Sequence, residues 1–205
     1  MNITNLADLR KLYGPARERS VKKEIPELDA HAMQFIDRSP FVVLASSDAD
    51  HNMDASPRGG EAGFVKVLNS QTLLIPDAPG NNRLDTLENI IASGHIGLLF
   101  MVPGFDETLR IHGRAVLSVD PADLQTCTDA KRVPTLAIRV TVESVYLHCG
   151  KALMRSKLWD SERHADRAQM PSMAEMMRDQ IRAFKGEDIE AETQAQMVER
   201  YRQSL

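Results

Sequence analysis

The chain has 205 residues, and its 25 basic and 29 acidic side chains give a net charge of −4 with histidine neutral. This length predicts one compact domain with appendages. A hydrophobic fraction of 42% is typical of a globular protein and argues against a disordered chain. The mild acidity argues against a nucleic-acid binder, because such proteins usually carry a basic excess.

Sequence patterns divide the chain into three segments within a single domain. Residues 1–38 are predicted to form a helical segment that packs on the centre, residues 39–159 hold nearly all the β pattern, and residues 160–205 are predicted to be helical. No apolar run reaches the roughly 18–20 residues of a membrane span, and no signal-peptide pattern precedes the domain. We therefore expect a cytoplasmic protein with no membrane partner. Its two cysteines, Cys127 and Cys149, show no disulfide or zinc spacing, and we expect Cys149 to be buried and inert.

The first part of the central segment is predicted to follow one helix with strands. Asp29 is expected to cap a helix in which Met33 and Ile36 face inward. The turn residues Asn69-Ser70 predict a hairpin. A continuous apolar run after Pro40 predicts a strand buried on both faces. These elements span residues 30–38 for the helix, and 41–45, 63–68, 72–75 and 95–102 for the strands.

Two longer strands follow, and they show clearer alternation. Residues 108–119 alternate apolar and polar side chains, with Val119 on the apolar face. In residues 135–142 the apolar face is even-numbered, but it continues afterwards on Val145 and Leu147. A bulge near Glu143-Ser144 would account for this change of parity.

The remaining helices are marked by their termini. Asp120-Pro121 predicts a helix start, and Ser172 with Glu175 forms a capping box for a helix that ends at Lys185. A helix is also expected over residues 83–91. About six antiparallel strands with few helices favour a small β-barrel over a parallel doubly wound sheet.

The segment from Leu73 to Leu84 predicts a phosphate-binding turn. A strand ends at Pro76, a turn rich in Pro, Gly and Asn follows, and a helix begins near Arg83. The first turn of a helix has free backbone N–H groups and a positive dipole end. Gly80 permits close approach of a ligand, while Asn82 and Arg83 can bind an anion. The alternative is that Asn81 or Asn82 only caps the helix and that Arg83 is solvated.

Two further segments carry candidate binding residues. Asp54–Gly60 places Arg58 in what the sequence predicts to be a Gly-rich turn between strands. Lys151, Arg155 and Trp159 recur at i, i+4 and i+8, which predicts one helix face with two cations and an aromatic ring. Such a face could hold an anionic planar ligand. The alternative is a solvated basic face with Trp159 in the core.

Three motifs in this order resemble the pyridoxamine 5′-phosphate oxidase-like family of FMN-binding split-barrel proteins. They are Ser-Pro-Arg-Gly at 56–59, Leu-Leu-Ile-Pro-Asp…Gly-Asn-Asn-Arg at 73–83 and Lys-Ala-Leu-Met-Arg-Ser-Lys-Leu-Trp at 151–159. The resemblance covers about residues 25–185. It implies a mainly β fold with peripheral helices, a six-stranded antiparallel split β-barrel, and a homodimer with FMN at the subunit interface.

The resemblance also implies roles for individual residues. Ser56, Pro57 and Arg58 match the segment along the flavin. Separately, reduced flavin carries a negative charge, and the charge of Arg58 makes it the candidate cation that would stabilise this form. Thr108 and Arg110 are weaker matches. Ile75, Pro76 and Asp77 match the backbone beside the flavin ring, and Asn82 and Arg83 match the phosphate ligands. Lys151, Arg155 and Trp159 match the residues that the partner subunit contributes.

An FMN-dependent oxidoreductase that uses a small-molecule substrate or NAD(P)H is the function that this resemblance implies. The Trp-plus-Arg substrate motif of true pyridoxamine phosphate oxidases is not found, so no substrate and no catalytic residue are predicted. Two alternatives stay open: a non-catalytic FMN carrier or redox-sensing module, and a flavin-free β-barrel that mediates interactions. The spacing of the six histidines predicts no metal site.

Overall fold

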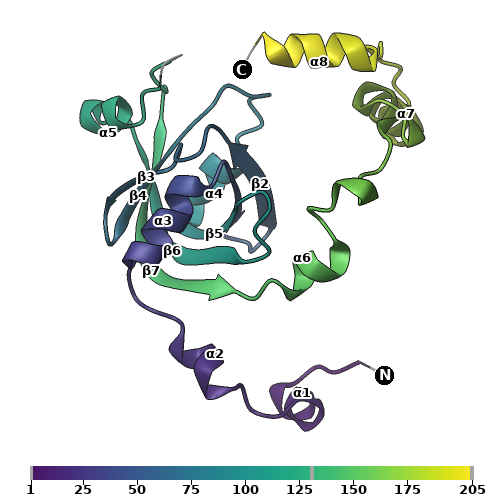
Figure 1. Ribbon diagram of the computed structural model, residues 1–205. Coiled ribbons are helices and arrows are strands. Elements are labelled where there is room, and N and C mark those ends of the chain that lie inside the picture. The colour runs from purple at the N-terminus through teal and green to yellow at the C-terminus, as the bar shows by residue number, and fades with distance from the viewer. Residues whose placement is uncertain (1, 130–131, 204–205) are drawn as a thin grey trace. The chain divides into compact units, whose positions relative to one another are not determined.

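The computed structural model describes residues 2–129 and 132–203. The chain divides between Trp159 and Asp160 into two compact units. The first unit contains an antiparallel β-sheet with peripheral helices, which confirms the mainly β fold class (Figure 1). The second unit is helical.

Seven strands form one sheet in the order β2-β1-β5-β6-β7-β4-β3, with β2 and β3 at its edges. The expectation of six strands is wrong, because the Ser-Pro-Arg segment forms strand β2 and not a turn. Its position at an edge accommodates Pro57, which cannot donate a ladder hydrogen bond. The strands are β1 (Phe41–Ser47), β2 (Met53–Gly59), β3 (Lys66–Asn69), β4 (Thr72–Pro76), β5 (His95–Met101), β6 (Thr108–Ser118) and β7 (Ala137–His148).

Six helices accompany this sheet in the first unit. Helix α3 is capped as predicted, since the Asp29 side chain accepts a hydrogen bond of 2.8 Å from the Ala32 N–H. It buries Ile36 completely, and Met33 packs against the core. The helices are α1 (Leu6–Leu12), α2 (Glu18–Lys22), α3 (Ala30–Arg38), α4 (Asp85–Ser93), α5 (Pro121–Thr126) and α6 (Lys151–Ser156).

The core lies on one face of β1 and its neighbours. Val42 and Leu44 are fully buried, whereas Phe41, Val43 and Ala45 are only partly covered. The prediction that this strand is buried on both faces is therefore wrong for the single chain. Facing residues from the other strands complete the core, chiefly Leu73, Ile75, Leu98, Phe100, Leu109, Ile111, Ile138 and Val140.

The predicted bulge in β7 is confirmed. His112 pairs with Ser144 and Gly113 pairs with Val142, so Glu143 is the extra residue. A Cβ atom on Gly113 would lie 2.1 Å from the Thr141 carbonyl oxygen, and only glycine permits this approach. Strand β6 ends one residue before Val119, which is exposed and not on the apolar face.

The second unit contains helices α7 (Met173–Lys185) and α8 (Gln194–Arg202), preceded by the short 3-10 turns η1 (Ser161–Arg163) and η2 (Arg167–Gln169). The Ser172–Glu175 capping box and the stop at Gly186 are both present. Thr193 and Gln196 form a second capping box at the start of α8. None of the helices in the described ranges is long and apolar enough to cross a membrane.

An ion pair joins α5 to the sheet. The buried Asp123 carboxylate accepts hydrogen bonds of 2.6 Å from the Ser118 hydroxyl and 2.6 Å from the Arg139 guanidinium. The Ser118 hydrogen bond, with help from Arg139, lowers the pKa of Asp123 below its usual value of 3.8. Because the unfolded chain then binds a proton more readily, this group stabilises the fold above pH 3.8 and loses its effect as pH falls through the folded pKa.

Replacing Asp123 with Ala should lower the free energy of unfolding at neutral pH by about 1–3 kcal/mol, because Ser118 and Arg139 lose their acceptor. The difference between the wild type and the variant should shrink below pH 3.8. Urea unfolding at several pH values measures both effects. A difference that does not change between neutral and acidic pH would contradict the role of the carboxylate charge.

Candidate functional site

The loop between β4 and α4 links two distant parts of the sheet. Strand β4 lies beside the edge strand β3, whereas α4 packs on β1 and β2 at the other side (Figure 1). The loop starts at Asp77, whose N–H donates to the Leu136 carbonyl at 2.9 Å. The chain therefore carries the predicted phosphate segment across to the side of the sheet that contains β2.

The start of α4 differs from the prediction. The helix begins at Asp85, and Leu84 occupies its N-cap position in a left-handed conformation with φ 58° and no side-chain cap. Asn82 is also left-handed, with φ 57°. The left-handed conformation is unfavourable for residues other than glycine, so these two positions strain the backbone locally. Strain of this type is found at ligand sites. The leucine side chain cannot accept a hydrogen bond, so the backbone N–H groups in the first turn of α4 receive no cap from the N-cap residue.

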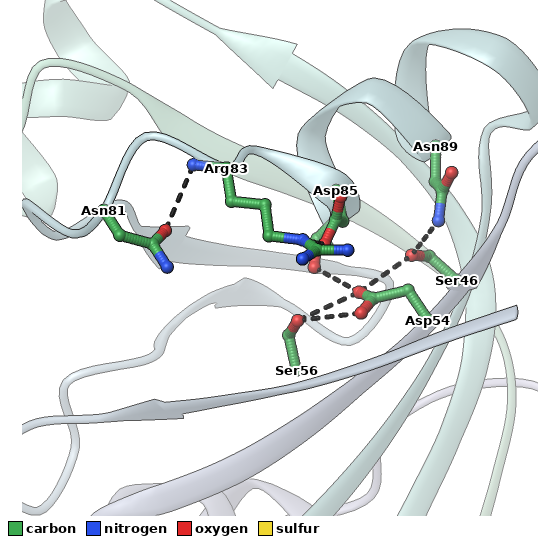
Figure 2. A network of polar contacts seen from close by, with 8 residues as sticks. Ser46, Asp54, Ser56, Asn81, Arg83, Asp85 and Asn89 are labelled. Atoms are coloured by element: carbon green, nitrogen blue, oxygen red, sulfur yellow. Dashed lines mark hydrogen bonds and ion pairs between the residues drawn. The ribbon is translucent and has the colours of Figure 1, made fainter. Parts of the chain in front are cut away.

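Neither asparagine caps α4, so that part of the alternative is wrong, whereas Arg83 is exposed as the alternative expects. The Asn81 side-chain oxygen accepts a 3.1 Å hydrogen bond from the Arg83 N–H and shapes the loop (Figure 2). The Arg83 side chain is 76% exposed, and its Nε donates to Asp85 at 2.5 Å. An exposed ion pair of this kind contributes little stability. The terminal guanidinium nitrogens of Arg83 remain available to an anion.

Strand β2 presents the second group of predicted residues. Ser56 and Arg58 pair with Leu44 and Val42 across the ladder, so they lie on the core face of the sheet. Pro57 lies on the opposite face. Arg58 donates to the Pro57 carbonyl oxygen at 3.0 Å, and its other guanidinium nitrogens make no hydrogen bond or ion pair among the described residues.

A network around Asp54 joins β1 and β2 to α4, and the sequence patterns did not identify it. The Asp54 carboxylate accepts hydrogen bonds from Ser56 at 3.0 Å and from Thr86 at 2.7 Å (Figure 2). Ser46 lies 3.5 Å from the same carboxylate and accepts a 3.0 Å hydrogen bond from Asn89. Strands β1 and β2 are thereby fixed to α4. The alternation of Asp54 with Ser56 and Arg58 on one strand face is the signal that could have indicated it.

Ile75, Pro76 and Asp77 lie at and just beyond the end of β4. The Ile75 side chain is fully buried in the core, so only its backbone could line a ligand. Pro76 pairs with Ala137, and Pro76 and Asp77 are partly covered. The weaker matches lie on β6, where Thr108 is buried and Arg110 donates to the Tyr146 hydroxyl at 2.8 Å.

The Lys151–Trp159 segment does not form one helical face. Helix α6 ends at Ser156 and Lys157 is left-handed, so Trp159 lies beyond the helix. The Trp159 indole N–H donates to the Phe105 carbonyl at 2.8 Å. Lys151 and Arg155 are exposed on α6.

Within one chain, this segment does not join the other candidates. It follows the end of β7 where His148 pairs with Thr108, whereas α4 is anchored to Ser46 and Asp54 at the opposite end of β1 and β2. The structure therefore links Ser56 through Asp54 to α4, with Asn82 and Arg83 in the loop just before that helix. Arg58 pairs with Val42, toward the end of the strands where His148 lies, so it is not gathered with them. Lys151, Arg155 and Trp159 follow β7 at that same end.

The gathered donors fit a phosphate monoester. Arg83 supplies charge, Asn82 can supply an amide, and the uncapped start of α4 supplies backbone N–H groups. A Cβ atom on Gly80 would meet no heavy atom closer than 4.0 Å, so the loop leaves space there. No cluster of three or more potential metal ligands occurs within residues 2–129 and 132–203.

The two cysteines lie outside this group. Cys127 is buried, and burial raises the pKa of its thiol to about 11, which keeps it protonated and inert at neutral pH. Cys149 is exposed, so the expectation that it is buried is wrong.

Several solved structures are similar to this chain at low identity. HupZ of Group A Streptococcus has 16% identity and a TM-score of 0.48, over 58% of this chain and 91% of its own. A putative pyridoxamine 5′-phosphate oxidase from Lactobacillus delbrueckii has 19% identity and a TM-score of 0.46, over 60% and 99%. An FMN-binding protein from Syntrophomonas wolfei has 8% identity and a TM-score of 0.45, over 70% and 97%.

The comparison with curated proteins found no match. The family model described as pyridoxamine 5′-phosphate oxidase matches residues 28–149, which contain all seven strands of the sheet. This match covers more than half of the sequence. The chain therefore belongs to the pyridoxamine 5′-phosphate oxidase family.

Proposed function

We propose that this protein is an FMN-binding oxidoreductase. The observation that carries the proposal is the loop before α4, where two left-handed residues expose Arg83 beside a helix start without a side-chain cap. Family membership over residues 28–149 supports the same function. The donors on β2 and the backbone end of β4 supply further positions for a flavin.

The phosphate of FMN is assigned to the loop before α4. A phosphate monoester carries roughly −1.5 to −2 charges at neutral pH and needs several donors. Asn82, Arg83 and the first-turn N–H groups of α4 offer them in one short segment. The neighbouring Asp85 holds Arg83 Nε at 2.5 Å and so orients the guanidinium without occupying its terminal nitrogens.

The ring of FMN is assigned to β2 and to the backbone at residues 75–77. Bound FMN supplies the electron or hydride transfer itself. The Arg58 guanidinium makes no ion pair with a described carboxylate, so its charge is available to stabilise the negative reduced ring. A small-molecule substrate or NAD(P)H is the proposed reaction partner.

A homodimer is part of the proposal. The outer face of β1 and β5 leaves Phe41, Val43 and Leu99 only partly covered, and Met53 on β2 is 74% exposed. An apolar surface of this kind favours association with a second copy. The segment with Lys151 and Arg155 lies away from the Arg83 loop of its own chain, and we assign it to the flavin of the partner.

Replacing Arg83 with Ala should weaken FMN binding about 10- to 100-fold, because a hydrogen bond to a charged group contributes about 1.5–3 kcal/mol. Riboflavin lacks the phosphate, so its affinity should change little. Fluorescence titration measures both dissociation constants. The matched control is Arg182→Ala, which removes another exposed and carboxylate-paired arginine, and it should leave both affinities unchanged. An unchanged FMN affinity in Arg83→Ala would exclude Arg83 from the phosphate site.

The redox function is tested on the flavin-loaded protein without oxygen. Addition of NADPH or NADH should bleach the visible flavin absorbance, and air should restore it over repeated cycles, because a turnover enzyme passes the electrons on. If both nucleotides leave the flavin oxidised while dithionite reduces it, the protein is an FMN carrier or sensor and not an NAD(P)H-dependent oxidoreductase.

The shared site is tested by mixing two defective variants. Arg83→Ala and Lys151→Ala/Arg155→Ala should each bind FMN weakly alone. After equal amounts are mixed and allowed to exchange, about a quarter of the sites should regain wild-type affinity, since half of the dimers are mixed and each then has one intact site. The stoichiometry of tight FMN binding measures this. Absence of recovery in demonstrated mixed dimers would show that Lys151 and Arg155 do not act on the partner's flavin.

A further inference from the structure

The Asp54 carboxylate is surrounded by hydroxyl groups and not by cations. Ser56 lies 3.0 Å from both of its oxygens, and the Thr86 hydroxyl lies 2.7 Å from one of them (Figure 2). Thr86 is buried, whereas Asp54 and Ser56 are partly covered. In the described part of the chain no lysine, arginine or histidine pairs with Asp54, and Arg83 pairs with Asp85.

This arrangement fixes the direction of the hydrogen bonds. An ionised carboxylate only accepts hydrogen bonds, and a hydroxyl has a single proton to donate. The Ser56 proton is therefore committed to Asp54. The lone pairs that remain on the Ser56 oxygen can only accept a hydrogen bond from a ligand.

The same arrangement separates Ser56 from phosphate binding. A phosphate oxygen accepts hydrogen bonds, as the committed Ser56 hydroxyl does, so the two offer no proton to each other. The Asp54 charge beside Ser56 also repels an anion. The partner of Ser56 must instead carry an N–H or O–H group.

We propose that Asp54 is a positioning residue, which holds Ser56 as a hydrogen-bond acceptor for a donor group of the flavin outside its phosphate. The inference rests on the proposed function and deepens it. Two groups of the flavin have this chemistry, the imide N–H of the ring and the hydroxyls of the ribityl chain. Ser56 therefore selects for the riboflavin part of the ligand, while Arg83 selects for the phosphate.

A purely structural role of Asp54 makes a different prediction. Through Thr86 the carboxylate also anchors α4, so its loss could displace the loop that contains Arg83. Thr86→Val removes this anchor and leaves the Ser56 contact in place. Asp48 accepts hydrogen bonds from Asn52 in the same β1–β2 hairpin and serves as a matched control carboxylate.

The test measures the affinities of FMN, riboflavin and lumiflavin for the wild type, Ser56→Ala, Asp54→Asn and the double variant. Ser56→Ala and Asp54→Asn should each weaken FMN and riboflavin binding by the same factor, about 3- to 10-fold, which is typical of one neutral hydrogen bond. The double variant should lose no more than Ser56→Ala alone, because Asp54 acts through Ser56. Thr86→Val and Asp48→Asn, measured while folded, should retain wild-type affinities.

Lumiflavin, which has the ring but no ribityl chain, identifies the donor. A loss of lumiflavin affinity in Ser56→Ala assigns the ring N–H, and an unchanged affinity assigns a ribityl hydroxyl.

Three results would overturn the inference while FMN binding by the wild type stands. They are unchanged affinities in Ser56→Ala, a loss for FMN without a loss for riboflavin, and losses of Ser56→Ala and Asp54→Asn that add in the double variant. A Thr86→Val variant that matches Asp54→Asn would assign Asp54 to the anchoring of α4 instead. If the wild type binds neither FMN nor riboflavin, the proposed function fails and the inference fails with it.

Discussion

The docking of α4 on β1 and β2 is the constraint on which the candidate site depends. Several contacts share this docking: Leu87 and Ile90 of α4 are buried in the core, and the Asp54 carboxylate binds Thr86 in the first turn of the helix. The loop with Asn82 and Arg83 ends where α4 begins, so its position follows from this anchor. Without this docking, the phosphate segment would be a surface loop with no fixed relation to β2.

The sheet separates the two groups of residues that the proposed site would use. Its core face is closed by α3 and by the strands themselves, and Ile36, Leu44 and Phe100 fill it. The outer face of β1 and β5 is apolar but only partly covered. Arg83 and Lys151 lie toward opposite ends of the strands, which is why the proposed site takes them from two copies of the chain.

Local sequence patterns predicted the elements whose signals lie within a few residues. The Asp29 cap, the Ser172–Glu175 capping box and the change of parity at Glu143 each depend on neighbours in the chain, and the structure has all three. The start of α4 was misplaced because a left-handed leucine at an N-cap has no sequence signature. Strand β2 was taken for a turn because Pro and Gly usually mark turns.

Contacts between distant residues explain the rest of the differences. Thr86 is 32 residues from Asp54 and Asn89 is 43 residues from Ser46, so local spacing does not indicate that α4 joins the polar side chains of β1 and β2. Trp159 lies beyond α6 because Lys157 turns the chain, and its indole N–H binds a carbonyl of the β5–β6 connection. The resemblance to a family identified the candidate residues, but the tertiary fold determined which of them meet.

Strand β2 lies at the open border of the sheet, and this position has a consequence for solubility. Unpaired borders of sheets are templates on which further chains can add, strand after strand, into aggregates. Pro57 in the middle of β2 removes one N–H from the ladder, and the charged Arg58 follows it. The same short sequence that faces the proposed ligand thereby discourages uncontrolled polymerisation of the protein.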